Sequence, residues 1–136
     1  MKLSKIALEA EANALAALFN GGFMDYFDGT QPSSADFSVS TQTLGVTLVF
    51  GSPAFKPAVG GVLTANPLIA GVVNREIKVA WARCYKADHQ TALVDLTVGV
   101  ADSADIIMPT THLVPGIQVP VSRFSFSIQN WKGPLT

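Results

Sequence analysis

The pattern of apolar positions changes once along the chain, from helical spacing to the alternation of strands. Ser4 can serve as the N-cap of a helix, and the run Asn20-Gly21-Gly22 ends it. Between these signals the apolar residues recur at steps of four, three and four positions, at Leu8, Ala12, Leu15 and Phe19. The spacing predicts a helix over about residues 5–19 that lies across a β core or against a neighbouring subunit.

After Gly22 the pattern is typical of short strands separated by turn residues. Residues 77–86 are largely apolar on both faces, which predicts a strand at the centre of a sheet, and the turn at Asp88-His89-Gln90 leads into a hairpin partner at 91–100. In the last strand the apolar residues shift from odd to even positions, which predicts a bulge near Ser122. The strands predicted in this way cover residues 23–28, 43–50, 62–64, 68–70, 77–86, 91–100, 104–108 and 116–131.

One leading helix followed by about eight short strands predicts an all-β fold with an N-terminal α-helix. Within that class the regular turns favour a β-sandwich, and more narrowly a jelly roll. The 136 residues suit a single domain, 1–136, which is long enough to bury a core without a metal or a disulfide.

Charge is unusually scarce in this chain. Only 14% of the residues are charged while 49% are hydrophobic, whereas ordinary soluble domains carry about 25% charged residues. Much of the surface must therefore consist of neutral polar and apolar side chains. Such a surface favours a protein that is covered by partners.

The charges that are present do not form the pattern of a nucleic-acid or membrane protein. The 9 basic and 10 acidic residues are scattered and give a net charge of −1, so we expect no nucleic acid and no membrane among the partners. The basic start resembles the opening of a signal peptide, but Glu9 and Glu11 interrupt the apolar stretch that a signal needs. No apolar run reaches the roughly 18 residues of a membrane-spanning helix.

Reactive side chains are few, and their positions favour structural roles. Cys84 lies within an apolar strand, which predicts a buried thiol rather than a nucleophile. His89 and His112 have no cysteine, histidine or carboxylate at metal-ligand spacing. Asp102 and Asp105 could bind calcium loosely, but turn chemistry explains them better because Asp side chains accept hydrogen bonds from nearby amides.

The spacing of the carboxylates indicates no acid–base pair, because they lie on different predicted elements. We therefore expect no enzyme, no catalytic residue, no metal and no cofactor. The carboxylates in question are Asp25, Asp28, Asp36, Asp88 and Asp95.

Most aromatic side chains are expected in the core, because basic residues do not alternate with them as a nucleic-acid platform requires. Trp131 is the exception, since it precedes a tail rich in helix and strand breakers. We predict a partner interface that contains Phe55, Trp131, Pro134 and Leu135.

Several short turn and strand segments follow one another in a characteristic order along most of the chain. They are Tyr26-Phe27-Asp28-Gly29-Thr30-Gln31-Pro32, Thr43-Leu44, Pro53-Ala54-Phe55, Gly61-Val62-Leu63-Thr64-Ala65-Asn66, Ala80-Trp81, Tyr85-Lys86-Ala87-Asp88, Leu93-Val94-Asp95, Val98-Gly99, Ala104-Asp105 and Val121-Ser122-Arg123-Phe124-Ser125-Phe126. In this order and spacing the chain resembles a family of small virion proteins of tailed bacteriophages. It departs from the family at Asp88-His89, where the family favours Asp-Gly, and in its longer tail after Phe126.

Members of that family look like capsid cement, or decoration, proteins. The resemblance implies a non-enzymatic jelly-roll protein on the outer capsid surface of the virion, where it bridges the capsomers of an HK97-like shell. Its implied partners are the major capsid protein and copies of itself, as a homo-oligomer (dimer or trimer). Two alternatives stay open, a structural protein of the tail or baseplate and a carbohydrate-binding β-sandwich on the virion.

Overall fold

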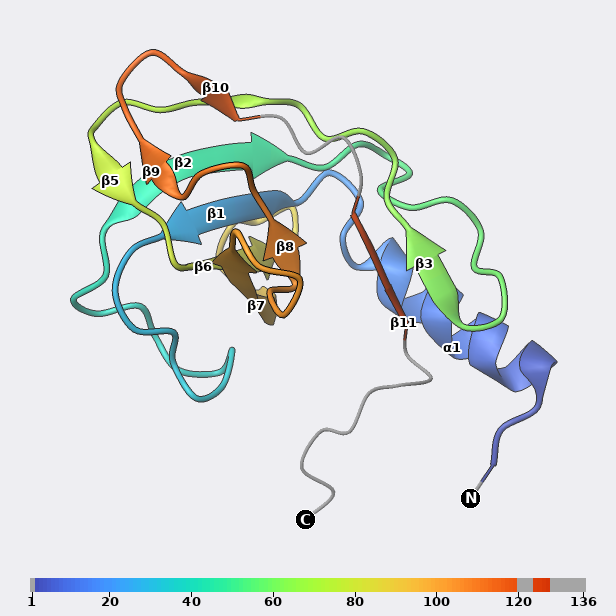
Figure 1. Ribbon diagram of the computed structural model, residues 1–136. Helices are drawn as coiled ribbons and strands as arrows, with labels where there is room; N and C mark the ends of the chain where they lie inside the picture. Colours follow the sequence, from blue (N-terminus) through green and yellow to red (C-terminus); the bar gives the residue numbers. More distant parts are fainter. Residues whose placement is uncertain (1, 120–123, 128–136) are drawn as a thin grey trace.

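The computed structural model describes residues 2–119 and 124–127. Its secondary structure is mostly β with one N-terminal helix, which confirms the predicted fold class. Figure 1 shows the helix at one end of the molecule and the largest sheet at the other. The bulge predicted near Ser122 and the predicted interface residues Trp131, Pro134 and Leu135 lie outside the described residues.

Helix α1 (Lys5–Ala17) begins where the sequence predicts. The Ser4 hydroxyl accepts a hydrogen bond from the Ala7 amide at 3.2 Å, which satisfies one of the free amides of the first turn. Ala12 and Phe19 of the predicted stripe are fully buried. On the polar face, the Asn13 side chain accepts from the Ala58 amide at 2.9 Å and the Glu9 carboxylate from the Gly60 amide at 3.2 Å. The helix is thus tied to the segment before β3 (Val62–Thr64) and does not cross the largest sheet (Figure 1).

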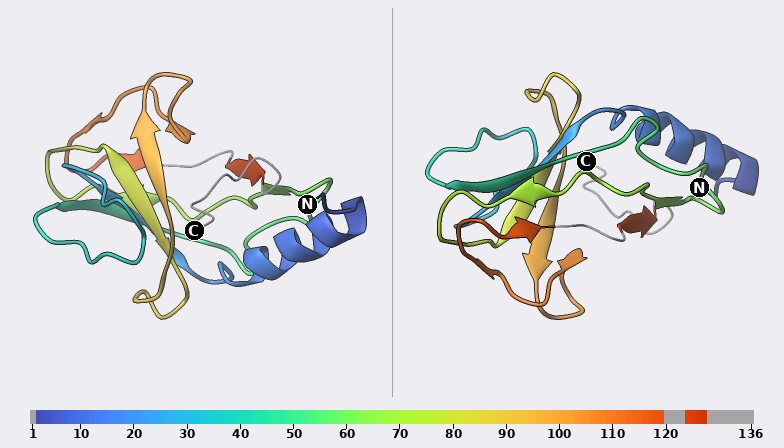
Figure 2. Two further views of the ribbon diagram at one scale, coloured as in Figure 1. Left: turned by 90° about the horizontal axis from the view of Figure 1, so that it is seen from below. Right: turned by 90° about the horizontal axis from the view of Figure 1, so that it is seen from above.

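The main sheet has five strands in the order β2-β1-β6-β7-β8. Neighbouring strands are antiparallel except for β7 and β8, which are parallel. Figure 2 shows the strong twist of this sheet, in which β7 runs steeply across the direction of β2. The curled sheet is compatible with a β-sandwich, while the jelly roll stays a prediction. Its strands are β1 (Phe23–Phe27), β2 (Leu44–Val49), β6 (Trp81–Tyr85), β7 (Ala92–Gly99) and β8 (Ile106–Ile107).

Three two-stranded sheets are also formed by the described residues: β3 with β11, β4 with β10, and β5 with β9. The strand predicted over 77–86 is therefore wrong as a single element, because β5 and β6 belong to different sheets. The chain changes sheet at Val79, whose amide donates to Thr111, and Ala80, whose amide donates to Phe27. The strands are β3 (Val62–Thr64), β4 (Gly71–Val72), β5 (Ile77–Lys78), β9 (His112–Leu113), β10 (Gln118–Val119) and β11 (Ser125–Ser127).

Strand β6 lies at the centre of the main sheet, as predicted. Four of its five residues are buried, and Trp81 is fully buried. The Trp81 indole N–H donates to the carbonyl of Asp28 at 2.9 Å, and its ring stacks on Phe27 with centroids 4.7 Å apart. Trp81 therefore joins β6 to the end of β1 through both apolar and polar contacts.

Replacing Trp81 by Ala should lower the free energy of unfolding by about 3–5 kcal/mol, because truncation of a buried aromatic ring leaves a cavity. Urea denaturation measures this loss. Trp81→Phe is the matched control: it keeps a ring beside Phe27 and should cost less. A loss below about 1 kcal/mol for the Ala variant would place Trp81 outside the core.

Candidate binding sites

A row of polar side chains crosses one face of the main sheet. The strand register places Thr47 of β2, Asp25 of β1, Arg83 of β6 and Asp95 of β7 side by side. Asp25 and Arg83 are only 5% and 3% exposed. Aromatic residues flank the row on the same face, so the polar groups lie between apolar neighbours. The structure thus brings together two of the scattered carboxylates, with a cation between them.

Arg83 forms the strongest contacts of this row. Its Nε and Nη2 donate to the two carboxylate oxygens of Asp95 at 2.6 and 2.9 Å, which is the bidentate geometry that favours charged pairs. Its other donations go to the backbone carbonyls of Phe37 at 2.7 Å and Ser34 at 3.4 Å. The hydrogen bond to Asp95 raises the pKa of Arg83 above its ordinary value. Arg83 therefore stays charged and ties the loop after β1 to the sheet.

Asp25 is bound from two other sides. The Thr47 hydroxyl donates to its Oδ1 at 2.6 Å, and the His89 Nε2 lies 2.8 Å from its Oδ2. The His89 ring also stacks on Phe23, with centroids 4.1 Å apart. Since the hydroxyl and the imidazole contact the same carboxylate, the nucleophile–imidazole–carboxylate order of a hydrolytic triad is not formed by these three groups.

His89 takes the backbone conformation that favours glycine, with φ of 56°. This residue lies in the turn between β6 and β7. Asp88 supports it, because its carboxylate accepts from the amides of Gln90 and Thr91 at 2.9 and 2.8 Å and from the Thr91 hydroxyl at 2.6 Å. These hydrogen bonds lower the pKa of Asp88 to about 2.

An open hollow of about 480 Å³ lies beside His89, between the loop after β1 and the β6–β7 turn. We call it the Phe37 hollow. Among the aromatic side chains that the structure describes, Phe37 is the most exposed, at 58%. The hollow is lined by Ala35, Asp36, Phe37, Ser38, Val39, Arg83, Tyr85, His89, Gln90, Thr91 and Ala92.

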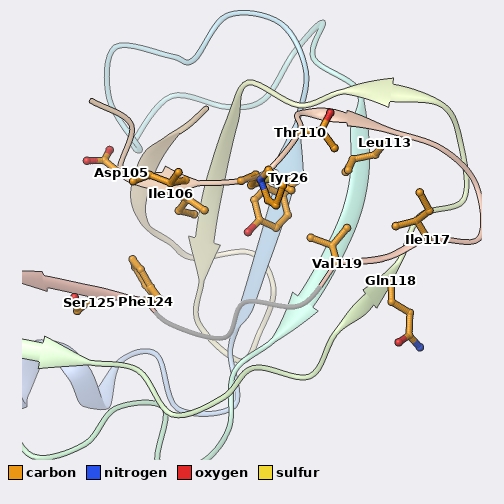
Figure 3. A pocket seen from close by; sticks show the side chains of 13 residues that line it. Tyr26, Asp105, Ile106, Thr110, Leu113, Ile117, Gln118, Val119, Phe124 and Ser125 are labelled. Carbon is orange, nitrogen blue, oxygen red and sulfur yellow. The ribbon is translucent and has the colours of Figure 1, made fainter. Parts of the chain in front are cut away.

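A second pocket, of about 570 Å³, opens between β1, β8 and β10, and its lining is mainly apolar. Figure 3 shows Tyr26 between Ile106 on one side and Val119 on the other. Tyr26 is fully buried, and its hydroxyl has no hydrogen-bond partner among the described residues. Burial, with a smaller contribution from Cys84, raises the pKa of Tyr26 well above its ordinary value. The hydroxyl is therefore a neutral, desolvated group beside an apolar cavity.

Four exposed apolar side chains lie in or next to β4 and β10. The backbone joins these segments, since the Val73 amide donates to Ile117 and the Gly116 amide to Val73. A Cβ at Gly71 would collide with the backbone of Thr47, so glycine lets β4 lie closely against β2. We call this region the β4–β10 patch and define it by Ile69, Val72, Val114 and Ile117, which are 65%, 57%, 38% and 44% exposed.

The remaining predicted residues lie as follows. Phe55 is only 5% exposed and packs against three other Phe rings, so it belongs to the core, contrary to its predicted place at a partner interface.

Cys84 is buried as predicted, and burial raises its pKa above the ordinary value. The Asp105 carboxylate accepts from the amide and hydroxyl of Thr97 at 2.9 and 3.1 Å, so it bonds to β7, eight positions earlier, and not within its own turn. His112 pairs with Glu76 at 2.8 Å.

Within residues 2–119 and 124–127, no group of three or more His, Cys, Asp or Glu side chains is arranged to hold a metal ion. The single helix in that part of the chain is too short to cross a membrane. Comparison with protein-family models, with curated proteins and with solved structures found no match.

Replacing Tyr26 by Phe should leave the protein as stable as before or stabilise it by about 1–3 kcal/mol, because a buried hydroxyl without a partner carries an uncompensated desolvation cost. Urea denaturation measures the change.

Thr47→Val is the matched control, since the Thr47 hydroxyl donates to Asp25 Oδ1 at 2.6 Å and its removal should cost about 1–3 kcal/mol. If Tyr26→Phe destabilised the protein as much as Thr47→Val does, the Tyr26 hydroxyl would have a partner and its description as unsatisfied would be wrong.

Proposed function

We propose that this chain is a non-enzymatic structural protein of a tailed-phage virion that decorates the outer capsid surface and bridges neighbouring capsomers. The β4–β10 patch carries the proposal, because exposed branched apolar side chains in a chain with only 14% charged residues are suited to burial against a partner. The resemblance of the ordered segments to phage decoration proteins supports the same role. The partners proposed are the major capsid protein and further copies of this chain.

The hydrogen bonds and ion pairs within the polar row also support a structural role for the chain. Asp95 is paired with Arg83, and Asp25 is held by Thr47 and His89. These bonds hold the sheet and its covering loop together. The β4–β10 patch itself is apolar, so binding of a partner there needs neither a metal nor a reactive side chain.

The same patch also allows an alternative role as a structural protein of the tail or baseplate. Exposed apolar side chains are suited to burial, but they do not show which part of the virion covers them. Cryo-EM of labelled particles separates the two locations. Label on the head shell supports decoration, whereas label confined to the tail would overturn the capsid proposal.

The residue-level test compares two exposed valines. Val72 lies in the β4–β10 patch and is 57% exposed, while Val100 follows β7 and is 63% exposed. Val72→Glu should weaken binding to capsids of the parent phage stripped of this protein by tenfold or more, roughly, because an unpaired charge would be buried at the interface. Co-sedimentation across a concentration series measures the binding.

Val100→Glu is the control and should bind as the unaltered protein does. Urea denaturation should find both variants folded, because both sites are exposed. Unchanged capsid binding by Val72→Glu, or equal losses in the two variants, would remove the β4–β10 patch from the interface.

A further inference from the structure

We propose that the Phe37 hollow is a binding site for a neutral saccharide. It shares no residue with the β4–β10 patch, so the inference does not depend on the proposed capsid role. Three features carry it: an exposed aromatic ring on an anchored backbone, a polar lining, and a local charge balance that leaves no unpaired cation among the groups described for the hollow.

The backbone that carries the Phe37 ring is held by hydrogen bonds, one of them from the main sheet. Arg83, which is 3% exposed, donates to the carbonyl of Phe37 at 2.7 Å. The Phe37 amide donates to the carbonyl of Ser34 at 3.1 Å, and the Ser34 hydroxyl accepts from the Asp36 amide at 3.1 Å. A buried charged side chain thus holds a surface loop whose central side chain is an exposed Phe. Such preorganisation lowers the entropic cost of binding.

The lining of the hollow is suited to hydroxyl groups. Beside Phe37 and Tyr85 it contains the polar side chains of Asp36, Ser38 and Gln90. A pyranose ring has an apolar face of C–H groups, which can pack on an aromatic ring, and an edge of hydroxyls, which can bond to amide, hydroxyl and carboxylate groups. The combination of one exposed aromatic ring with a polar surround therefore fits a sugar.

The charges of the hollow favour a neutral ligand. The guanidinium of Arg83 is matched by the bidentate carboxylate of Asp95, and its further donations go to backbone carbonyls. Asp36 contributes a carboxylate, which would repel a phosphate or a sulfated sugar. Since nucleic-acid binding depends on cations that contact phosphates, the hollow is poorly suited to a polyanion.

The position of His89 completes the site. Its Nε2 is held by Asp25, and its ring stacks on Phe23 and meets Tyr85 edge to face, at centroid distances of 4.1 and 5.3 Å. The imidazole is thereby fixed at the wall of the hollow. Two walls, the loop with Phe37 and the turn with His89, are each anchored to the same polar row of the sheet.

The test is a glycan array probed with the full chain displayed multivalently, followed by calorimetry with the best-bound neutral glycan. Phe37→Ala should lower the affinity for that glycan by about tenfold, because the ring provides the packing surface. Ile6→Ala is the matched control: Ile6 is an 80% exposed apolar residue on α1, and its loss should leave the affinity unchanged. Urea denaturation should find both variants folded.

Absence of binding by the unaltered chain to every neutral glycan, or equal affinity of the Phe37→Ala variant, would overturn the saccharide site. Preference for sulfated or phosphorylated glycans alone would overturn its neutral character. Capsid binding separates this inference from the proposed function, since Phe37→Ala should bind capsids as the unaltered chain does. If that variant lost capsid binding while no glycan bound, the hollow would belong to the capsid interface and the saccharide site would be wrong.

Discussion

The buried ion pair between Arg83 and Asp95 fixes where the loop after β1 lies on the main sheet. Removing two charges from water costs several kcal/mol for each ion, and only close, multiple hydrogen bonds offset that cost. Here the pair is bidentate, and the remaining Arg83 donations go to the carbonyls of Phe37 and Ser34. The loop after β1 must therefore lie over this face of the sheet, because without its carbonyls the guanidinium would be incompletely bonded.

This constraint explains how β6 is buried on both faces. One face joins the apolar core, where Ala82 and Cys84 are fully buried. The other carries the polar row together with the fully buried ring of Trp81, whose indole contacts the carbonyl of Asp28. A covering loop held by side-chain-to-carbonyl bonds thus takes the place of a second sheet over that face. The same bonds position the exposed ring of Phe37 beside the hollow.

Local patterns in the sequence predict the parts of the fold that depend on neighbouring residues. The cap at Ser4, the helix stripe and the hairpin of β6 with β7 are of this kind. The split of 77–86 into β5 and β6 could not be predicted, because alternation indicates a face but not a partner strand. For the same reason Phe55, in a segment without periodicity, gave no sign of its burial.

The candidate sites were less predictable than the fold. The polar row joins residues that are up to 70 positions apart, from Asp25 to Asp95, so no spacing announces it. The sequence did contain one indication of the row. Arg83 alternates with Trp81 and Tyr85 and so shares their face of the strand, which places a cation on a face that is otherwise aromatic. A buried cation requires a carboxylate partner. Only the register of the neighbouring strands shows which carboxylate lies opposite it.

Amide hydrogen exchange at Phe37 tests the central role of the ion pair most directly. In the double variant Arg83→Met with Asp95→Leu, apolar side chains of similar volume replace the pair, and such replacements leave stability nearly unchanged or raise it. We expect the variant to fold with near-native stability while exchange at the Phe37 amide becomes faster by about tenfold or more, because the loop has lost its anchor. Equal protection of that amide in the double variant and the unaltered chain would contradict the account.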